Sequence, residues 1–264
     1  MIPYFGGKSY LADWVISHFP ENYKNLSYCE VFGGGGWVLY KKEPSRIETY
    51  NDLNKNIVNL FRVIRDRFPE FNHRANWSLH SRELFQEAKA KLQDDKTLSD
   101  IERAIHYSIL QTQSFSGDGH SWTYRVSPSH VFSGKWLPLL KRLELINIRL
   151  KRVQIECLDF EKVIQKYDSK DTLFYLDPPY FGKEKYYQKE EVYFGNEDHI
   201  RLATTLHNIK GKFLLSYYDH PKIKKLYRGN RIVQKCIPKY GSKSKLVEAI
   251  ATKPRAKEIL IMNY

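Results

Sequence analysis

Residues 173–180 read LFYLDPPY: four apolar residues are followed by Asp177, Pro178, Pro179 and Tyr180. An apolar run that ends in a carboxylate and two prolines is typical of a buried strand that stops at a turn. At the carboxyl end of such a strand, a carboxylate, two prolines and an aromatic ring can hold a flat, amine-bearing ring. The alternative is an ordinary proline-rich turn, which is the commoner meaning of two adjacent prolines.

Six other segments share the strand character of residues 172–177: 27–31, 46–50, 153–158, 212–217, 231–237 and 258–262. Helix-like segments lie between several of them, among them 37–41, 54–67 and 160–167. Alternation of strands and helices is typical of a doubly wound sheet, whose ligands bind at the carboxyl ends of the strands. We therefore predict an α/β fold with a Rossmann-like, seven-stranded sheet.

Residues 68–150 break this alternation because they contain no convincing long strand. Their pattern predicts helices over 81–92, 99–112 and 134–147, with a polar and aromatic loop or hairpin at 114–132. We predict a mainly helical insertion between the second and third strands. The domain boundaries then give residues 1–67, 68–150 and 151–264.

The composition is that of an ordinary globular chain, with 264 residues and 42% hydrophobic content. It has no run of about 18 apolar residues, and its first residues lack the features of a signal peptide. We therefore expect a cytoplasmic protein. Cys29, Cys157 and Cys236 lie far apart in strand-like runs, which favours buried thiols over disulfides or a zinc site. The nine histidines have no paired metal spacing, and we expect no metal.

The positive charge is concentrated near the C-terminus. The whole chain has a net charge of +13, and residues 210–257 contain 14 lysines and arginines against two acidic residues, a local net of +12. Such a concentration favours a polyanionic partner, most often nucleic acid, although a solvated basic face is the alternative. An aromatic content of 14% is compatible with base stacking.

Glycines follow the first predicted strand. Residues 30–36 read EVFGGGG and precede a helix-like segment, so the backbone there is open to a cofactor. Asp52 ends the next strand, where a carboxylate can bind ribose hydroxyls. The pair predicts a nucleoside-containing cofactor; the alternative is a plain glycine turn and Asp52 as a helix N-cap. No third glycine follows Gly34 and Gly36 at the usual place, which speaks against a dinucleotide.

A second glycine cluster stands at the N-terminus, where residues 4–8 read YFGGK. These glycines can bring the backbone and the Lys8 ammonium close to a ligand carboxylate. Ser9 is then a predicted N-cap for the helix that follows. A phosphate-binding loop is excluded because its eight-residue spacing is not met.

Taken together and in this order, these elements resemble the DNA adenine methyltransferase (Dam) family, which methylates adenine N6 with S-adenosylmethionine. The family's aromatic-x-Gly-Gly-Lys element, cofactor turn, Asp-x-Asn element, Asp-Phe pair and catalytic motif are matched by residues 4–8, 30–36, 52–54, 159–160 and 177–180. Further likeness lies at 214–217 and 260–264. The resemblance covers about residues 1–66 and 151–264, and Val31 replaces the family's usual proline.

The resemblance implies a methyltransferase sheet that binds S-adenosylmethionine, releases S-adenosylhomocysteine and uses no metal. Lys8 and the glycine turn would lie near the methionine part, Asp52 on the ribose, and Asp159 with Phe160 over the adenine. For the last two residues, a helix cap and a core side chain are the alternatives. The cofactor-binding residues implied are Tyr4, Phe5, Gly7, Lys8, Glu30, Phe32, Gly34, Gly36, Asp52, Asp159, Phe160 and Asp177.

The resemblance assigns catalysis to Asp177, Pro178, Pro179 and Tyr180. Asp177 and the Pro178 carbonyl would accept the N–H groups of the adenine amine while Tyr180 stacks on the purine, which requires the adenine to leave the duplex. The partner would be double-stranded DNA, contacted by the basic C-terminal third and by the insertion, the family's target-recognition region. Within the insertion, Tyr124 and Arg125 are candidates for base or phosphate contact, with a solvated hairpin as the alternative.

Other functions stay open at this point. They are an amine methyltransferase for cytosine N4, RNA or a protein glutamine, and a DNA-binding protein that has lost catalysis. The N-terminal glycine–lysine element and the insertion favour DNA adenine, and the intact Asp52 and Asp177 favour an active enzyme. The sequence predicts neither the DNA recognition site nor a role alone, beside a restriction enzyme or in a virus. We expect no membrane partner, a monomer or weak dimer, and a prokaryotic or viral origin.

Overall fold

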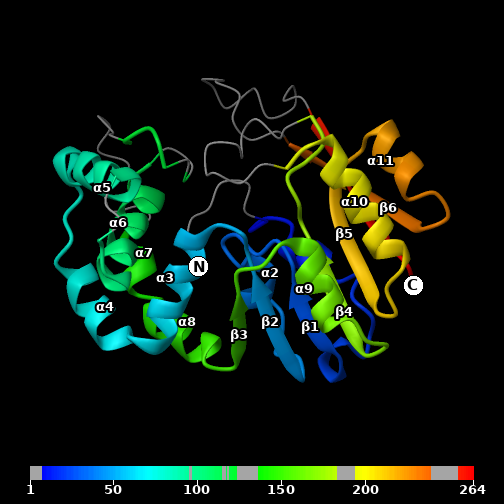
Figure 1. The fold of residues 1–264 in the computed structure, drawn as a ribbon, viewed down its shortest axis with the longest axis horizontal. Helices are drawn as coiled ribbons and strands as arrows, with labels where there is room; N and C mark the ends of the chain where they lie inside the picture. Colours follow the sequence, from blue (N-terminus) through cyan, green and yellow to red (C-terminus); the bar gives the residue numbers. More distant parts are fainter. Residues whose placement is uncertain are drawn as a thin grey trace. The chain divides into compact units, whose positions relative to one another are not determined.

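The structure is a computed structural model, and it describes residues 8–94, 97–114, 117, 119–123, 136–182, 194–238 and 255–264. In this part of the chain it has seven strands (Figure 1): β1 (Ser27–Glu30), β2 (Ile47–Asn51), β3 (Val153–Glu156), β4 (Thr172–Leu176), β5 (Lys212–Tyr218), β6 (Arg231–Pro238) and β7 (Arg255–Met262). They form one sheet in the order β3-β2-β1-β4-β5-β7-β6. The predicted α/β class and seven-stranded, Rossmann-like sheet are confirmed.

Most strand pairs are parallel. β2 pairs in parallel with β1 and β3, and β4 pairs in parallel with β5, whereas β7 is antiparallel to β5 and β6. All residues of β4 are buried, as expected for a parallel strand with both faces covered. Because parallel strands end at the same edge, the carboxyl ends of β1, β2 and β3 lie together, and so do those of β4 and β5.

The chain divides into two compact units, Met1–Asp159 and Phe160–Tyr264. The first contains β1 to β3 and the helices α1 (Ala12–Ile16), η1 (Tyr23–Asn25), α2 (Trp37–Lys41), α3 (Lys55–Asp66), α4 (Phe68–Asn76), α5 (Arg82–Asp94), α6 (Asp100–Gln113), α7 (Trp136–Leu140) and α8 (Leu143–Leu150). Helices α6 and α8 pack on α3, and α5 packs on α6. Helices α4 to α8 agree with the helical character predicted for residues 68–150; the division into domains at 67 and 150 stays a prediction.

A buried ionic cluster joins α8 to β2 in the first unit. Glu48 is 2% exposed and accepts hydrogen bonds from Lys42 Nζ at 2.5 Å and from both Nη atoms of Arg149. Arg149 also donates to the Leu39 carbonyl at 2.9 Å. Burial opposes ionisation of Glu48, but the hydrogen bonds from Arg149 and Lys42 outweigh it and hold the pKa of Glu48 below its ordinary value of 4.5. The cluster therefore depends on an ionised Glu48.

The second unit contains β4 to β7 with α9 (Phe160–Tyr167), α10 (Asn196–His207) and α11 (Pro221–Leu226). Helices α9 and α10 pack together. The loop before β5 is fixed by Asp168, whose carboxylate accepts hydrogen bonds from the backbone N–H groups of Lys210 and Gly211. Asn263 accepts from the Phe213 N–H at 2.9 Å and donates to the Gly211 carbonyl at 3.0 Å. These contacts fix β5 next to the C-terminal strand.

Three local predictions are wrong. Ser9 does not cap the first helix, because the N-cap of α1 is Leu11, which makes no side-chain cap bond. The helix expected over 134–147 is two helices, since a turn at Lys141 and Arg142 separates α7 from α8. Of the three thiols expected to be buried, Cys29 is buried, but Cys157 is half-buried and Cys236 is exposed.

The exposure of the Cys157 and Cys236 side chains follows from their places in the sheet. Cys157 follows the end of β3, and Cys236 lies on β6, which among the described strands stands at the end of the sheet and pairs with β7. An edge strand exposes more side chains than a central one.

No helix in the described ranges is long and apolar enough to cross a membrane.

Candidate active site

Asn51, the last residue of β2, ties together the carboxyl ends of the three strands of the first unit. Its Nδ2 donates to the Val31 carbonyl, after β1, at 2.9 Å and to the Leu158 carbonyl, after β3, at 3.0 Å. Its Oδ1 accepts from the Leu158 N–H at 2.8 Å, and its own carbonyl accepts from the Gly33 N–H at 2.8 Å. The side chain is 1% exposed. Asn51 therefore fixes the starts of the loops that carry the predicted cofactor residues of this unit.

The backbone conformation and the packing of the turn between β1 and α2 both require glycine. Gly34 and Gly36 have φ values of 47° and 65°, in the left-handed region that side chains disfavour. A Cβ atom on Gly33 would lie 2.1 Å from the Tyr50 ring, whose hydroxyl donates to the Gly34 carbonyl at 2.7 Å. The shape of the turn thus requires these glycines, before any cofactor is considered.

Asp52 holds this turn to the start of α3. Its Oδ2 accepts from the Gly34 N–H at 2.7 Å and its Oδ1 from the Asn54 N–H at 2.8 Å. Burial raises the pKa of Asp52 above its ordinary value of 3.8, and hydrogen bonds from the backbone N–H groups of Asn54, Gly34 and Leu53 oppose that rise. The N-cap alternative is wrong for Asp52, because Asn54 caps α3 by accepting from the Asn56 N–H at 2.9 Å. An ionised carboxylate has about four acceptor positions, so Asp52 can accept from a ribose hydroxyl as well as from these N–H groups.

Three further predicted cofactor residues lie in the first unit. Glu30 is 2% exposed and accepts a hydrogen bond from the Tyr28 hydroxyl at 2.6 Å. Lys8 is buried, and its carbonyl accepts from the N–H groups of Leu11 and Ala12 where α1 begins. Phe32 is half-buried. Their roles toward the cofactor stay predictions.

Asp159 and Phe160 follow β3 and differ in exposure. Asp159 is half-buried, whereas Phe160 is 5% exposed. The Arg201 guanidinium lies 4.1 Å from the centroid of the Phe160 ring, and the Phe194 ring lies 5.8 Å away. These contacts favour a core role for Phe160, and its cofactor role stays a prediction.

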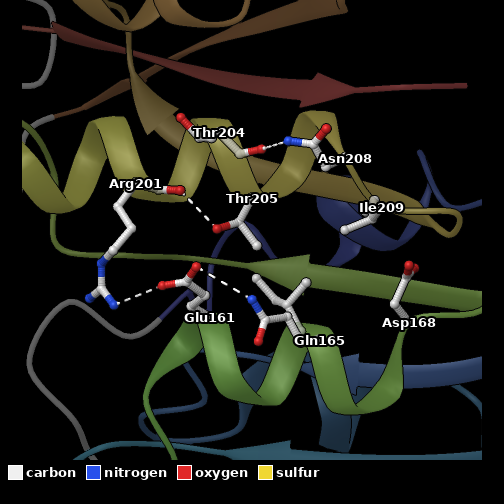
Figure 2. A pocket seen from close by; sticks show the side chains of 9 residues that line it. Glu161, Gln165, Asp168, Arg201, Thr204, Thr205, Asn208 and Ile209 are labelled. Atoms are coloured by element: carbon white, nitrogen blue, oxygen red, sulfur yellow. Dashed lines mark hydrogen bonds and ion pairs between the residues drawn. The ribbon is translucent and has the colours of Figure 1, made fainter.

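A groove of about 410 Å³ lies between α9 and α10 of the second unit (Figure 2). Its polar side chains bind one another: Arg201 donates to Glu161 at 3.2 Å, and Gln165 donates to the other Glu161 oxygen at 3.4 Å. Farther along α10, Asn208 donates to the Thr204 carbonyl. The groove contains none of the predicted site residues, and we assign it no role in the reaction.

The motif at residues 177–180 directly follows the fully buried strand β4. Asp177 is half-buried, while the two prolines and Tyr180 are buried. The Tyr180 hydroxyl donates to Glu258 of β7. Its ring lies 5.5 Å from the Tyr217 ring and 4.6 Å from the Tyr218 ring, the latter edge-on. The motif is therefore fixed by contacts to β5 and β7.

The remaining predicted site residues lie outside the described residues: Tyr4, Phe5, Gly7, Tyr124 and Arg125. Among the residues that the structure does describe, no group of three His, Cys, Asp or Glu side chains is placed to hold a metal ion.

Two residues of these contacts, Asn51 and Glu258, were missed by sequence reasoning. Each carries a weak signal. Asn51 is a polar residue at a predicted strand end, next to Asp52, and Glu258 is a charged residue beside the apolar residues 259–262. Neither signal predicts the hydrogen-bond partner of the residue, because a hydrogen bond across the sheet depends on the strand order.

Comparison with known proteins identifies the family. The chain matches the family described as D12 class N6 adenine-specific DNA methyltransferase over residues 4–237, most of its length. No curated protein matches it. The family confirms the predicted resemblance and the S-adenosylmethionine-dependent activity. The chain therefore belongs to the D12 class of N6 adenine-specific DNA methyltransferases, enzymes that methylate the N6 amine of adenine in DNA at specific sites.

Proposed function

We propose that the enzyme methylates an adenine that has left the duplex, and that Asp177 to Tyr180 hold this base. The observation that carries the proposal is the place of the motif: Asp177 directly follows a strand whose residues are all buried, and Tyr180 is fixed by three neighbours. A base inside a duplex cannot reach such a site, and enzymes that modify bases generally flip them out.

The residues of the motif would act by positioning. The N6 amine of adenine is a poor nucleophile because its lone pair is delocalised into the ring. Asp177 and the carbonyl of Pro178 would each accept one N–H of this amine, which favours tetrahedral nitrogen and a lone pair aimed at the methyl group. Tyr180 would stack on the purine and fix its plane. Orientation of this kind can supply a large part of the reduction in barrier.

The residues at the carboxyl ends of β1 to β3 fit S-adenosylmethionine. Asp52 and Asp159 are half-buried carboxylates, suited to ribose hydroxyls and to an adenine amine. Lys8, Glu30, Phe32, Gly34 and Gly36 would line the methionine part, together with Tyr4, Phe5 and Gly7. When bound, the cofactor supplies an electrophilic methyl group on a sulfonium, so that the chain itself needs neither a nucleophile nor a metal.

We further propose that the basic residues of the second unit contact the DNA backbone. Those of the segment 210–257 that the structure describes are exposed, except the half-buried Lys212. One of them, Lys224, is paired with Asp219 at 2.7 Å. Such residues position DNA without reading its sequence, so base readout would fall to the insertion, with Tyr124 and Arg125 as candidates. The described residues are Lys210, Lys212, Lys222, Lys224, Lys225, Arg228, Arg231, Lys235 and Lys257.

The cellular setting that we propose is the cytoplasm of a prokaryotic cell or of a cell infected by a virus. There the enzyme would act alone or beside a restriction enzyme. Sequencing of methylated adenines after expression in a methylation-free host would give the recognition site.

Base flipping can be tested once that site is known. A duplex with 2-aminopurine at the methylated position should gain fluorescence when enzyme binds, because the base leaves the stack. The variant Asp177→Ala should lower the rate of methyl transfer by at least about 100-fold. Asp171→Ala is the matched control, since Asp171 is exposed at the other end of β4. A wild-type rate in Asp177→Ala, or no gain of fluorescence, would contradict the proposal.

A further inference from the structure

Glu258 is a buried carboxylate in an apolar strand. It is 0% exposed, and Ile259 and Leu260, which follow it in β7, are 0% exposed as well. A carboxylate that is removed from water lowers stability unless hydrogen bonds compensate, and an apolar side chain of similar size is often more stable at such a position. The presence of Glu258 therefore points to the group that it contacts.

One such group is the hydroxyl of Tyr180, the aromatic residue of the catalytic motif. Glu258 accepts a hydrogen bond from the Tyr180 hydroxyl. In the antiparallel pairings of β7 it stands opposite Tyr218 of β5 and opposite Lys235 of β6. The Tyr180 ring contacts the rings of Tyr217 and Tyr218 at 5.5 and 4.6 Å. Two neighbours thus limit the tilt of the ring, and Glu258 fixes its far end.

The hydroxyl can act as the donor throughout the working pH range. Burial, together with the nearby carboxylates of Asp177 and Glu258, raises the pKa of Tyr180 well above its ordinary value of 10. A protonated hydroxyl against a carboxylate gives a charge-assisted hydrogen bond, which is shorter and stronger than one between neutral groups.

We propose that Glu258 is a positioning residue for methyl transfer: it holds the Tyr180 ring in the plane in which the target adenine stacks. The inference rests on the proposed function, because it requires Tyr180 to contact the adenine. A ring without its hydroxyl anchor can turn about its side-chain torsions, and the stacked base turns with it. A misplacement of about 1 Å can lower a reaction rate about 100-fold.

Four variants separate positioning from a merely structural role. Glu258→Leu replaces the hydrogen-bond acceptor with an apolar side chain of similar size, and Glu258→Gln keeps a neutral acceptor. Tyr180→Phe keeps the ring but removes the hydrogen-bond donor. The fourth combines Glu258→Leu with Tyr180→Phe. Glu197→Leu is the matched control, since Glu197 is exposed on α10 in the same unit.

The measurements are kcat and KM for methyl transfer to DNA adenine, the Kd for S-adenosylmethionine, and the melting temperature. We expect Glu258→Leu and Tyr180→Phe each to lower kcat about 10- to 100-fold, with the Kd for the cofactor unchanged. The double variant should be no slower than the slower single variant, because both remove the same bond. Glu258→Gln should restore most of the rate.

Provided that the wild-type enzyme methylates adenine, two results would overturn the inference. One is a wild-type kcat in Glu258→Leu. The other is a wild-type kcat in Tyr180→Phe, which also decides the matter if Glu258→Leu does not fold. A wild-type enzyme that fails to methylate adenine would instead refute the function itself, so the two failures are distinguishable.

Discussion

Replacement of Asn51 by alanine should weaken both the fold and cofactor binding. The side chain is 1% exposed and makes three hydrogen bonds of 2.8 to 3.0 Å to backbone groups that follow β1 and β3. Each buried partner that loses its bond destabilises the fold by about 1–3 kcal/mol. Because two of the three bonds share Leu158, we expect about 3 kcal/mol in total. For a chain of this size that corresponds to a fall of roughly 6–12 °C in melting temperature.

The same variant should bind S-adenosylmethionine about tenfold more weakly, equivalent to about 1.4 kcal/mol, because the glycine turn and Asp159 lose their common anchor. Urea unfolding followed by circular dichroism gives the free energy of unfolding, and calorimetry gives the Kd. The matched control is Asn76→Ala, since Asn76 is exposed and bonds only within α4 in the contacts observed for the described residues. A free energy of unfolding within about 0.5 kcal/mol of wild type, or an unchanged Kd, would refute this account of Asn51.

Three further predictions concern charge and exposure. Glu48→Gln should lower the free energy of unfolding at pH 7 by about 3 kcal/mol, because two buried cations lose their carboxylate. The difference should narrow as the pH falls below about 4.5, since the lowered pKa of Glu48 makes its contribution one that is lost on protonation. In the folded protein, Cys236 should react fastest with a thiol reagent, whereas Cys29, whose pKa is raised by burial, should react only on unfolding. Replacement of Lys225 and Arg228 by alanine should reduce the salt dependence of DNA binding, by about 1.8 in the slope of log K against log salt.

Each of these predictions has a control. For Glu48→Gln it is Glu144→Gln, at an exposed position of α8, which should leave the pH dependence unchanged. For the thiols, Cys236→Ser should remove the fast phase; a fast phase that persists would contradict the exposure seen for Cys236. For DNA binding, alanine at the exposed Lys166 and Lys170 should keep the wild-type slope. An unchanged slope in the Lys225 and Arg228 variant would exclude this face from DNA contact.

The strands could be predicted from the sequence because apolar runs of a parallel sheet need only local periodicity. Their ends could not, because long-range pairing decides them. β3 stops at Glu156, two residues short of the predicted end, and the Leu158 N–H bonds instead to the Asn51 side chain. β7 begins three residues early, at Arg255, because it pairs with β6 as far as Pro238.

Some residues of the candidate site could likewise be predicted from the sequence, whereas their contacts across the sheet could not. Asp177 and Asp52 could be predicted because each is a carboxylate that directly follows a predicted strand. The contact of Tyr180 with Glu258 spans 78 residues, and no pattern in the sequence shows that β7 lies beside β5. The glycines were predicted at the correct turn, but the Tyr50 ring that excludes a side chain from Gly33 appears only in the fold.

The most direct test of the central claim is methyl transfer from labelled S-adenosylmethionine to DNA, followed by digestion to nucleosides and identification of the labelled base. Wild type and Asp171→Ala should place all label in N6-methyladenine, and Asp177→Ala should place almost none. Label in cytosine, or no label in any DNA by the wild-type enzyme, would contradict the account.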